Sequence, residues 1–170
     1  YKRQLYRLID DKLKFEIVLN DSLNIAMGGT TGVGVPFYSI PLHQPDGSEN
    51  NNMVAAYAAL HDKTVSIADA YIAEGFDFSG TRNFDKKTGY RSTSFLTIPM
   101  KNHEEEIIGV LQLLNAQDEH RKVIAFTAED QRLAESLASQ AAIALTNRML
   151  INQLEELFES LIDLINGAID

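Results

Sequence analysis

The sequence contains no cysteine among its 170 residues, and this absence excludes several chemistries. A thiol nucleophile, a disulfide redox centre, a thiolate metal site and a thioether-attached chromophore all need that side chain. Long apolar runs are missing too: no stretch of 18 apolar residues occurs, so we expect no membrane-spanning segment. The lack of cysteine fits a reducing compartment, and we predict a cytoplasmic location.

Positive charge is scarce. The chain has 15 Lys and Arg against 24 Asp and Glu, a formal net charge of -9. Such a chain repels nucleic-acid backbones and anionic membranes, so we predict neither as a partner. The net charge does not exclude a small anionic ligand in a locally basic or amide-rich pocket. Hydrophobic residues make up 45% of the chain, enough for one domain core, or for one domain plus an extended helix.

Spacings typical of catalysis are also lacking. No H-x-x-x-H, H-E-x-x-H or G-x-S-x-G motif occurs, and the glycine-rich loop at residues 27–50 has neither phosphate-loop nor dinucleotide-binding spacing. We therefore predict no catalytic residue, no metal site and no enzymatic activity for this fragment. The histidines fall in predicted loops or at helix ends and are expected on the surface: His43, His61, His103 and His120.

Apolar and polar residues alternate with period two near the start, which predicts a hairpin of two strands between residues 5 and 20. A helix is predicted at 52–61 and a short strand at 64–68. Residues 69–88 are expected to be irregular and rich in aromatics. Two strands at 94–100 and 106–115, joined by a polar turn, predict a second hairpin.

A single long helix is predicted from residue 127 to residue 170, because no proline interrupts it and Thr127 with Asp130 forms an imperfect capping box. Its second half carries a heptad seam, with Ile143 at a d position and Asn147 at an a position. The seam continues through Leu150, Leu154, Leu157, Leu161, Leu164 and Ala168.

This seam predicts a parallel homodimer through the C-terminal helix, and divides the chain into a domain at 1–148 and a coiled-coil or linker helix at 149–170. The alternative is an amphipathic helix packed on its own domain. Additional apolar residues that widen the face partly support that alternative: Ile151, Phe158, Ile162 and Ile165.

Four motifs resemble the GAF family: D-A-Y at 69–71, T-G-Y-R at 88–91, L-T-I-P-M-K-N at 96–102 and I-G-V-L-Q-L-L-N at 108–115. The chain is most similar to the GAF domains of cyclic-nucleotide phosphodiesterases and of bacterial signalling proteins, over residues 4–148. The resemblance implies an α/β (α+β) fold, with a central antiparallel sheet and helices on both faces. It also implies a small-molecule pocket covered by the segment between the middle strands.

Cyclic-nucleotide-binding members carry a dispersed N-K…F-x-x-x-D-E motif. Asn115, Phe126 and Asp130 match it, whereas Ala116 replaces its Lys and Gln131 replaces its Glu. The Lys–Asp ion pair of the motif therefore cannot form. The ligand, where one binds, is expected to be small and nucleotide-like or otherwise polar, and no cofactor is assigned.

By the same resemblance, five residues lie at or near ligand-contacting positions: Asn20, Asp85, Thr88, Ser92 and Gln112. The alternative for residues 85–89 is ordinary turn chemistry, a helix end stopped by glycine. At the level of function, the resemblance implies a regulatory sensor that controls a downstream signalling domain. The alternative is a ligandless dimerisation and relay scaffold, its pocket filled by Phe76, Phe78, Phe84 and Tyr90.

The last residues, 157–170, look like the helical lead-in to bacterial HD-type metal-dependent phosphohydrolase domains of the HD-GYP-like group. This resemblance implies an output domain of that type in the same protein, with its metal ligands outside this sequence. Members of the GAF family that reduce free methionine sulfoxide use cysteines, so this activity is not expected here.

Overall fold

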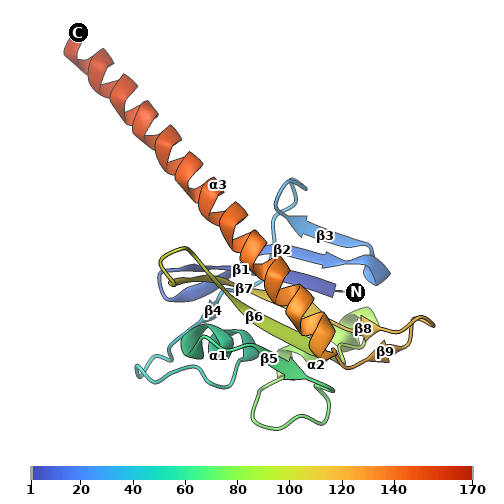
Figure 1. Cartoon of the computed structure of the whole chain (residues 1–170). Helices are drawn as coiled ribbons and strands as arrows, with labels where there is room; N and C mark the ends of the chain where they lie inside the picture. The colour runs from blue at the N-terminus through green and yellow to red at the C-terminus, as the bar shows by residue number, and fades with distance from the viewer. Residues whose placement is uncertain (1, 170) are drawn as a thin grey trace.

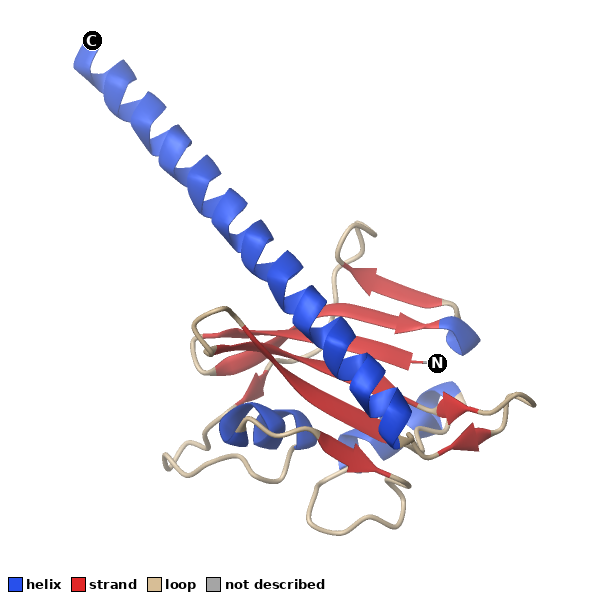
Figure 2. Ribbon diagram, viewed as in Figure 1, coloured by secondary structure: helices blue, strands red, loops and turns tan. Residues whose placement is uncertain are grey.

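A computed structural model describes residues 2–169. Its centre is an antiparallel sheet with the strand order β3-β2-β1-β7-β6-β5, and β4 pairs with β2 at one end (Figure 1). A helix lies on each face of this sheet (Figure 2). The strands are β1 Lys2–Ile9, β2 Lys12–Asn20, β3 Ile25–Gly28, β4 Ile40–Pro41, β5 Val65–Ile67, β6 Phe95–Lys101 and β7 Ile107–Leu114, with β8 Ala116–Gln117 and β9 Val123–Ile124 in a separate small hairpin.

The first hairpin is confirmed, and it turns at Asp10 and Asp11, both with positive φ (47° and 62°). Two such residues give the type I′ geometry whose twist matches that of the paired strands. β1 starts earlier than the pattern predicted, because Lys2 already pairs with Asn20 and with Leu114.

The second hairpin, β6 with β7, lies beside β1 in the middle of the sheet. Gly109 allows close approach there: a Cβ on this residue would lie 2.2 Å from the Tyr6 carbonyl oxygen. Any larger residue would push β1 away from β7, so this glycine is needed for the central pairing.

Helix α3 (Ala128–Ile169) covers one face of the sheet with its alanine-rich half (Figure 1). Its first turn is capped as predicted: Thr127 Oγ1 accepts from the Asp130 backbone N–H at 3.1 Å, and Asp130 Oδ2 accepts from the Thr127 N–H at 2.7 Å. Small side chains let the helix lie close to the sheet. The core of this layer is formed by Ala134, Ala138 and Ala142 against Leu96, Ile98 and Met100.

The opposite face is covered by α1 (Val54–His61) and by α2 (Ser79–Thr88). Two clusters form its core: Tyr6, Leu13 and Val110 with the alanines of α1, and Val54, Phe78, Phe95 and Leu114. The predicted helix at 52–61 is therefore confirmed, beginning two residues later than expected.

The second half of α3 leaves the domain (Figure 1). Every residue from 150 to 167 is exposed, the seam leucines by 48% at Leu161 to 73% at Leu164. The 42-residue helix is about 63 Å long at 1.5 Å per residue, which is longer than a domain of this size can cover. The alternative of a helix packed on its own domain thus fails for this half. Ala168, the last seam position, lies among residues whose side chains the structure does not describe.

One element prediction is wrong. Residues 69–88 are not irregular throughout, because 79–88 form α2, which ends at Gly89 in the left-handed conformation (φ 70°). The helix is strongly polar and buries only Asp85 among its own residues, so it lacked the apolar stripe that predicts a helix. The short elements β3, β4, β8, β9 and a 3-10 turn, η1 (Asp21–Leu23), were also not predicted.

Candidate functional site

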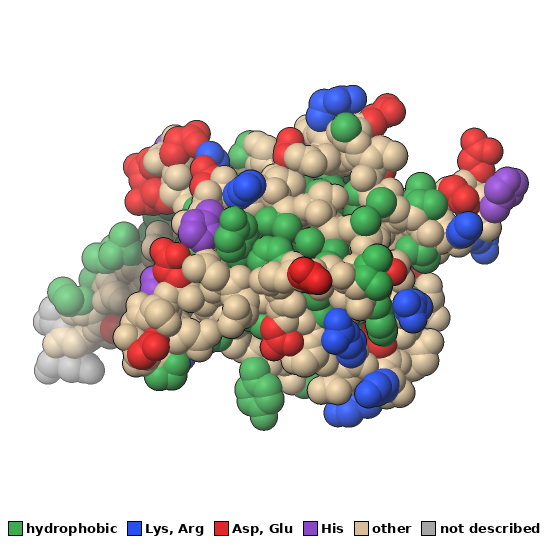
Figure 3. All heavy atoms as spheres, turned by 90° about the horizontal axis from the view of Figure 1, so that it is seen from below, with side chains coloured by type: hydrophobic (Ala, Val, Ile, Leu, Met, Phe, Trp, Pro, Cys, Tyr) green, Lys and Arg blue, Asp and Glu red, His purple; other side chains and the backbone are tan. Residues whose placement is uncertain are grey.

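A cavity of about 320 Å³ lies between the sheet and the helices α1 and α2. This is the lower end of the range for small-molecule sites. Seen from the side of α1 and α2, hydrophobic side chains gather in the middle of this face (Figure 3). Aromatic rings contribute much of the lining: Phe15, Phe37, Tyr38, Phe78, Phe84 and Phe95.

The floor of the cavity is polar at Gln4 and Gln112, and β6 adds a polar neighbour, Thr97, to this pair. Gln112 on β7 pairs with Gln4 on β1 and with Thr97 on β6. Gln112 Nε2 donates to Thr97 Oγ1 at 2.9 Å, and the Tyr6 hydroxyl donates to Gln112 Oε1 at 3.2 Å. All four side chains are buried, and burial raises the pKa of Tyr6 well above its ordinary range. Tyr6 therefore stays a neutral donor.

Lys2 lies at one end of this floor, only 7% exposed, and lines the cavity. Its Nζ is 4.1 Å from the centre of the Phe84 ring and forms no hydrogen bond or ion pair within the described residues. Burial lowers the pKa of Lys2 to about 8, although the nearby Asp85 carboxylate partly opposes the shift. The ammonium is therefore charged near neutral pH, but costly to hold there.

Of the five residues predicted by resemblance, Gln112 alone lines the cavity. Asp85 and Ser92 are buried beside it and bond to each other: the Asp85 carboxylate accepts from the Ser92 N–H at 2.7 Å and from its hydroxyl at 2.9 Å. The Tyr71 hydroxyl donates to the same carboxylate at 2.7 Å. These contacts fix the end of α2 against residues 90–94. The ligand roles of Asp85 and Ser92 stay predictions.

Thr88 and Asn20 also make local contacts. The Thr88 hydroxyl donates to the Phe84 carbonyl oxygen at 2.9 Å, so this residue belongs to the helix end that the turn alternative described. Asn20 is fully buried, and its Oδ1 accepts from the Leu23 N–H at 3.2 Å. Asn20 Nδ2, however, has no acceptor among the described residues. The ligand roles of Thr88 and Asn20 likewise stay predictions.

Two residues that match the cyclic-nucleotide motif, Asn115 and Asp130, form hydrogen bonds with backbone groups of this chain. Asn115, with a φ of 60°, accepts from the Thr93 N–H at 2.7 Å and donates to the Arg91 carbonyl oxygen at 2.7 Å. Asp130 caps α3. Both contacts hold segments of chain in place, and they account for these residues without a ligand.

Sequence reasoning missed Lys2, Gln4 and Tyr6 as site residues. The signal was present, since these three positions alternate with Arg3 and Leu5 in period two and so share one face of β1. It could not be used, because the sequence does not say whether that face meets a cavity, a helix or solvent.

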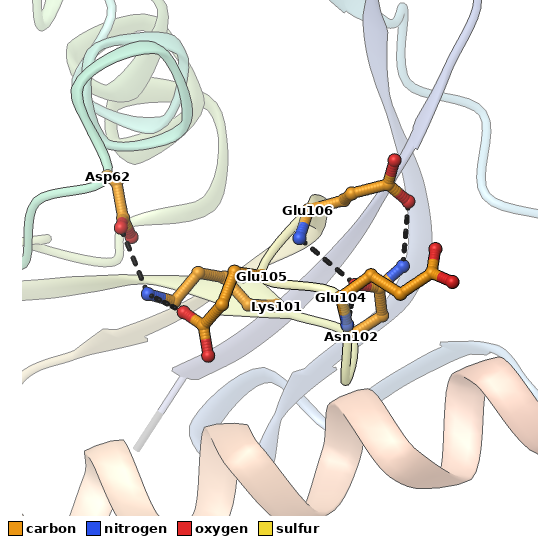
Figure 4. A network of polar contacts seen from close by, with 6 residues as sticks. All are labelled: Asp62, Lys101, Asn102, Glu104, Glu105 and Glu106. Atoms are coloured by element: carbon orange, nitrogen blue, oxygen red, sulfur yellow. Dashed lines mark hydrogen bonds and ion pairs between the residues drawn. The ribbon is translucent and has the colours of Figure 1, made fainter.

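A second hollow lies where α3 leaves the sheet, against the turn that joins β6 and β7. In this turn Lys101 Nζ contacts Asp62, just after α1, at 3.0 Å and Glu105 at 2.7 Å (Figure 4). Asn102 Oδ1 accepts from the N–H groups of Glu104 and Glu106. The network thus ties the end of α1 to a turn that borders α3 at Ile143 and Asn147.

The histidines make surface contacts, such as that of His43 Nδ1 with Asp11 at 2.8 Å. Within residues 2–169, no group of three or more His, Cys, Asp or Glu side chains is arranged to hold a metal ion. In the same part of the chain, no helix combines the length and the apolar character needed to cross a bilayer.

Comparison with known proteins agrees with this geometry. The sequence profile described as "GAF domain" matches residues 26–145. The chain belongs to the GAF domain family. GAF domains are regulatory modules that sense small molecules in signalling proteins, and the sheet with its covered pocket follows that plan.

Among curated proteins, the chain is 34% identical over 97 residues to the dual 3′,5′-cyclic-AMP and -GMP phosphodiesterase 11A of Takifugu rubripes. The match covers 57% of this chain but 10% of that protein, so the chain spans about a tenth of the curated relative.

Solved GAF structures share the fold. That of a phosphoenolpyruvate-protein phosphotransferase from Coxiella burnetii matches with a TM-score of 0.61 and 13% identity, over 89% of this chain and 75% of that one. The GAF domain of a two-component sensor histidine kinase from Bacillus halodurans gives 0.59 and 17%, over 89% and 85%.

Proposed function

We propose that this chain is a sensor GAF domain that binds a small, nucleotide-like or otherwise polar molecule in the cavity and relays occupancy through α3. The observation that carries the proposal is the combination of an aromatic lining with a buried polar floor at Gln4 and Gln112, where Thr97 holds the Gln112 amide by a hydrogen bond. A mostly apolar pocket with a few orienting polar groups is the usual form of a ligand site.

The scaffold alternative requires the pocket aromatics to fill the space. Phe78 and Phe84 line the cavity instead of closing it. Phe76 packs edge-on against Tyr57, with ring centroids 5.4 Å apart, and the Tyr90 hydroxyl accepts from Asn115 Nδ2 at 2.9 Å. Since the rings leave about 320 Å³ uncovered, the sensor function is favoured.

The relay proposal includes a parallel homodimer along α3. Apolar residues at the a, d and e positions are exposed in the half of α3 that extends beyond the domain. They are also exposed in the half that packs on the sheet, at Leu133, Leu137 and Ile143. One stripe thus follows the outer side of the whole helix, and a second copy of α3 is the partner whose surface matches it.

The dimer is tested by sedimentation at micromolar concentration. Leu154→Asp with Leu161→Asp should abolish it, because buried unpaired carboxylates cost several kcal/mol. Asn152→Asp with Asn166→Asp adds the same charge at outward positions of the heptad and should leave the dimer intact. A monomeric wild type, or dissociation by both pairs alike, would contradict the proposal.

We further propose a cytoplasmic protein in which α3 leads to an output domain, with an HD-type phosphohydrolase as the class to which residues 157–170 point. The fragment itself is proposed to lack activity. A longer chain, assayed with Mn²⁺ on cyclic mononucleotides and cyclic dinucleotides, should hydrolyse a substrate that residues 1–170 leave intact. Turnover by the fragment would contradict the assignment.

The sensor function is tested through α3. Because the chain has no cysteine, Asn152→Cys creates a unique position for a spin label. Calorimetry with cyclic AMP, cyclic GMP and a metabolite panel identifies a ligand, and the distance between the two labels of the dimer is then measured with and without it. A ligand-dependent change is expected. Binding that leaves this distance distribution unchanged would remove the relay, and absence of any binding would favour the scaffold.

A further inference from the structure

Lys2 lines the cavity with its ammonium over the Phe84 ring, and its neighbour Asn20 holds a buried amide donor, Nδ2, without an acceptor among the described residues. The two residues are directly paired between β1 and β2, so their side chains lie on the same face of the sheet. Lys2 is 7% exposed and Asn20 is 0% exposed. Buried donors are almost always paired, so the unpaired Asn20 Nδ2 next to a mostly buried lysine that lines the cavity needs an explanation.

The orientation of the Asn20 amide follows from its contacts. Its Oδ1 accepts from the Leu23 N–H, which leaves Nδ2 as the donor without an acceptor. No hydrogen bond joins this amide to the Asp85 carboxylate, whose own contacts are with Tyr71 and Ser92. The charge of this carboxylate stabilises the Lys2 ammonium from a distance.

Other charges around the cavity are few. Asp77 lines it, but this residue is exposed and accepts from the Ser79 N–H at 2.8 Å. A carboxylate at the entrance disfavours a ligand with several negative charges. The aromatic wall, including Phe84 beside Lys2, suits an apolar or planar body.

We propose that Lys2, assisted by Asn20, is the anion-binding residue of this cavity, and that the sensed molecule is a singly charged carboxylate or phosphodiester with an apolar or aromatic body. This inference rests on the proposed sensor function and names its ligand class. An anionic group beside Lys2 would give the ammonium a charge-assisted hydrogen bond, and Asn20, paired with Lys2 across the strands, has a free amide donor to add.

The experiment compares matched pairs of probes by calorimetry at pH 7. Phenylacetate is paired with phenylacetamide, cyclic AMP with adenosine, and cyclic GMP with guanosine. We expect the anionic member of at least one pair to bind more tightly. The first pair tests a carboxylate and the other two a phosphodiester, so the pair that responds identifies the chemical source of the charge.

Lys2→Met keeps the length of the side chain and removes the charge. It should lower the affinity of the preferred anion by about 10- to 100-fold and leave its neutral partner unchanged. Lys14→Met removes an equal charge from an exposed position of β2 that does not line the cavity, and should change neither. Asn20→Leu should give a smaller loss than Lys2→Met.

A second readout does not depend on affinity. The pKa of the Lys2 amine, followed by NMR of its ε-methylene group, should rise when the preferred anion is added and stay unchanged with the neutral partner. Equal affinity within every pair, or a preference that survives Lys2→Met, would overturn the inference. If a neutral probe still binds and moves α3, the sensor function stands and the anion-binding role of Lys2 fails. If no probe binds, the sensor function and the role of Lys2 both fail.

Discussion

Leu96 and Thr97 are neighbours on β6 and both are fully buried, yet they face different layers of the molecule. Leu96 packs under α3 in a layer of alanine, leucine, isoleucine and methionine. Thr97 faces the opposite layer and accepts a hydrogen bond from Gln112 at the cavity floor. The layer that contains Leu96 is apolar, whereas the opposite face keeps buried polar side chains, among them Asn20 with an unpaired amide donor. The first face therefore stabilises the fold, and the second gives up stability for the proposed binding surface.

The largest expected effect is on the α3 face. Leu96→Ala should lower the free energy of unfolding by about 2–5 kcal/mol, because it leaves a cavity in a fully packed layer. Urea unfolding followed by circular dichroism measures it. Ile72→Ala, at an 80% exposed position outside the helices, is the control and should cost about 0.5 kcal/mol or less. Equal costs would mean that the α3 layer is not the main core.

The cavity face should respond in the opposite direction. Lys2→Met is expected to stabilise the protein at pH 7 by about 1–3 kcal/mol, because it removes a buried ammonium that costs free energy to hold. Thermal unfolding at pH 7 measures this as a rise in Tm of several degrees. A clear loss of stability would show that Lys2 is a structural residue.

The pH dependence of that difference sharpens the test. The folded pKa of Lys2, about 8, lies below the ordinary 10.5, so between these pH values the unfolded chain keeps a proton that the folded chain has released. Wild-type stability relative to Lys2→Met should thus rise from pH 8 to pH 10.5, by at most about 3 kcal/mol. Urea unfolding of both proteins across this range measures the change.

A smaller effect is expected from Thr97→Val, which keeps the shape and removes the acceptor of the Gln112 amide. The cost should be about 1 kcal/mol, the usual value of one buried hydrogen bond. NMR of the Gln112 side-chain amide should show a shift and faster exchange with solvent. Ile98→Val, on the other face of the same strand, should leave that amide signal unchanged.

The smallest effect on stability is expected from Lys101→Met. Its partners are exposed, and ion pairs between exposed side chains contribute little to stability. The network of Figure 4 nevertheless joins the end of α1 to the turn beside α3. We expect nearly normal unfolding and a weaker ligand-dependent change in the spin-label distance. An unchanged distance response would exclude this network from the relay.

Local patterns in the sequence were sufficient for much of the fold. The hairpins follow from period-two alternation, and α3 follows from a capping box, the absence of proline and the heptad repeat. These features depend on near neighbours in the chain, so one sequence is enough to predict them. The family resemblance added the arrangement of sheet and helices. Of the residues it named, Gln112 lines the cavity, and its contact with a ligand stays a prediction.

Other features depended on contacts between distant residues. Helix α2 has no apolar stripe and is held through Asp85, whose partners Tyr71 and Ser92 lie outside the helix. From the sequence alone, Lys2 is expected to be a solvent-exposed charged residue, since lysine is rarely buried. Only the pairing of β1 with β2 and β7 sets it beside Asn20 and Leu114, and only the packing of Phe84 from α2 covers it. Burial and missing partners are properties of the assembled layers, and for this reason the tertiary structure alone decided which polar residues face the cavity.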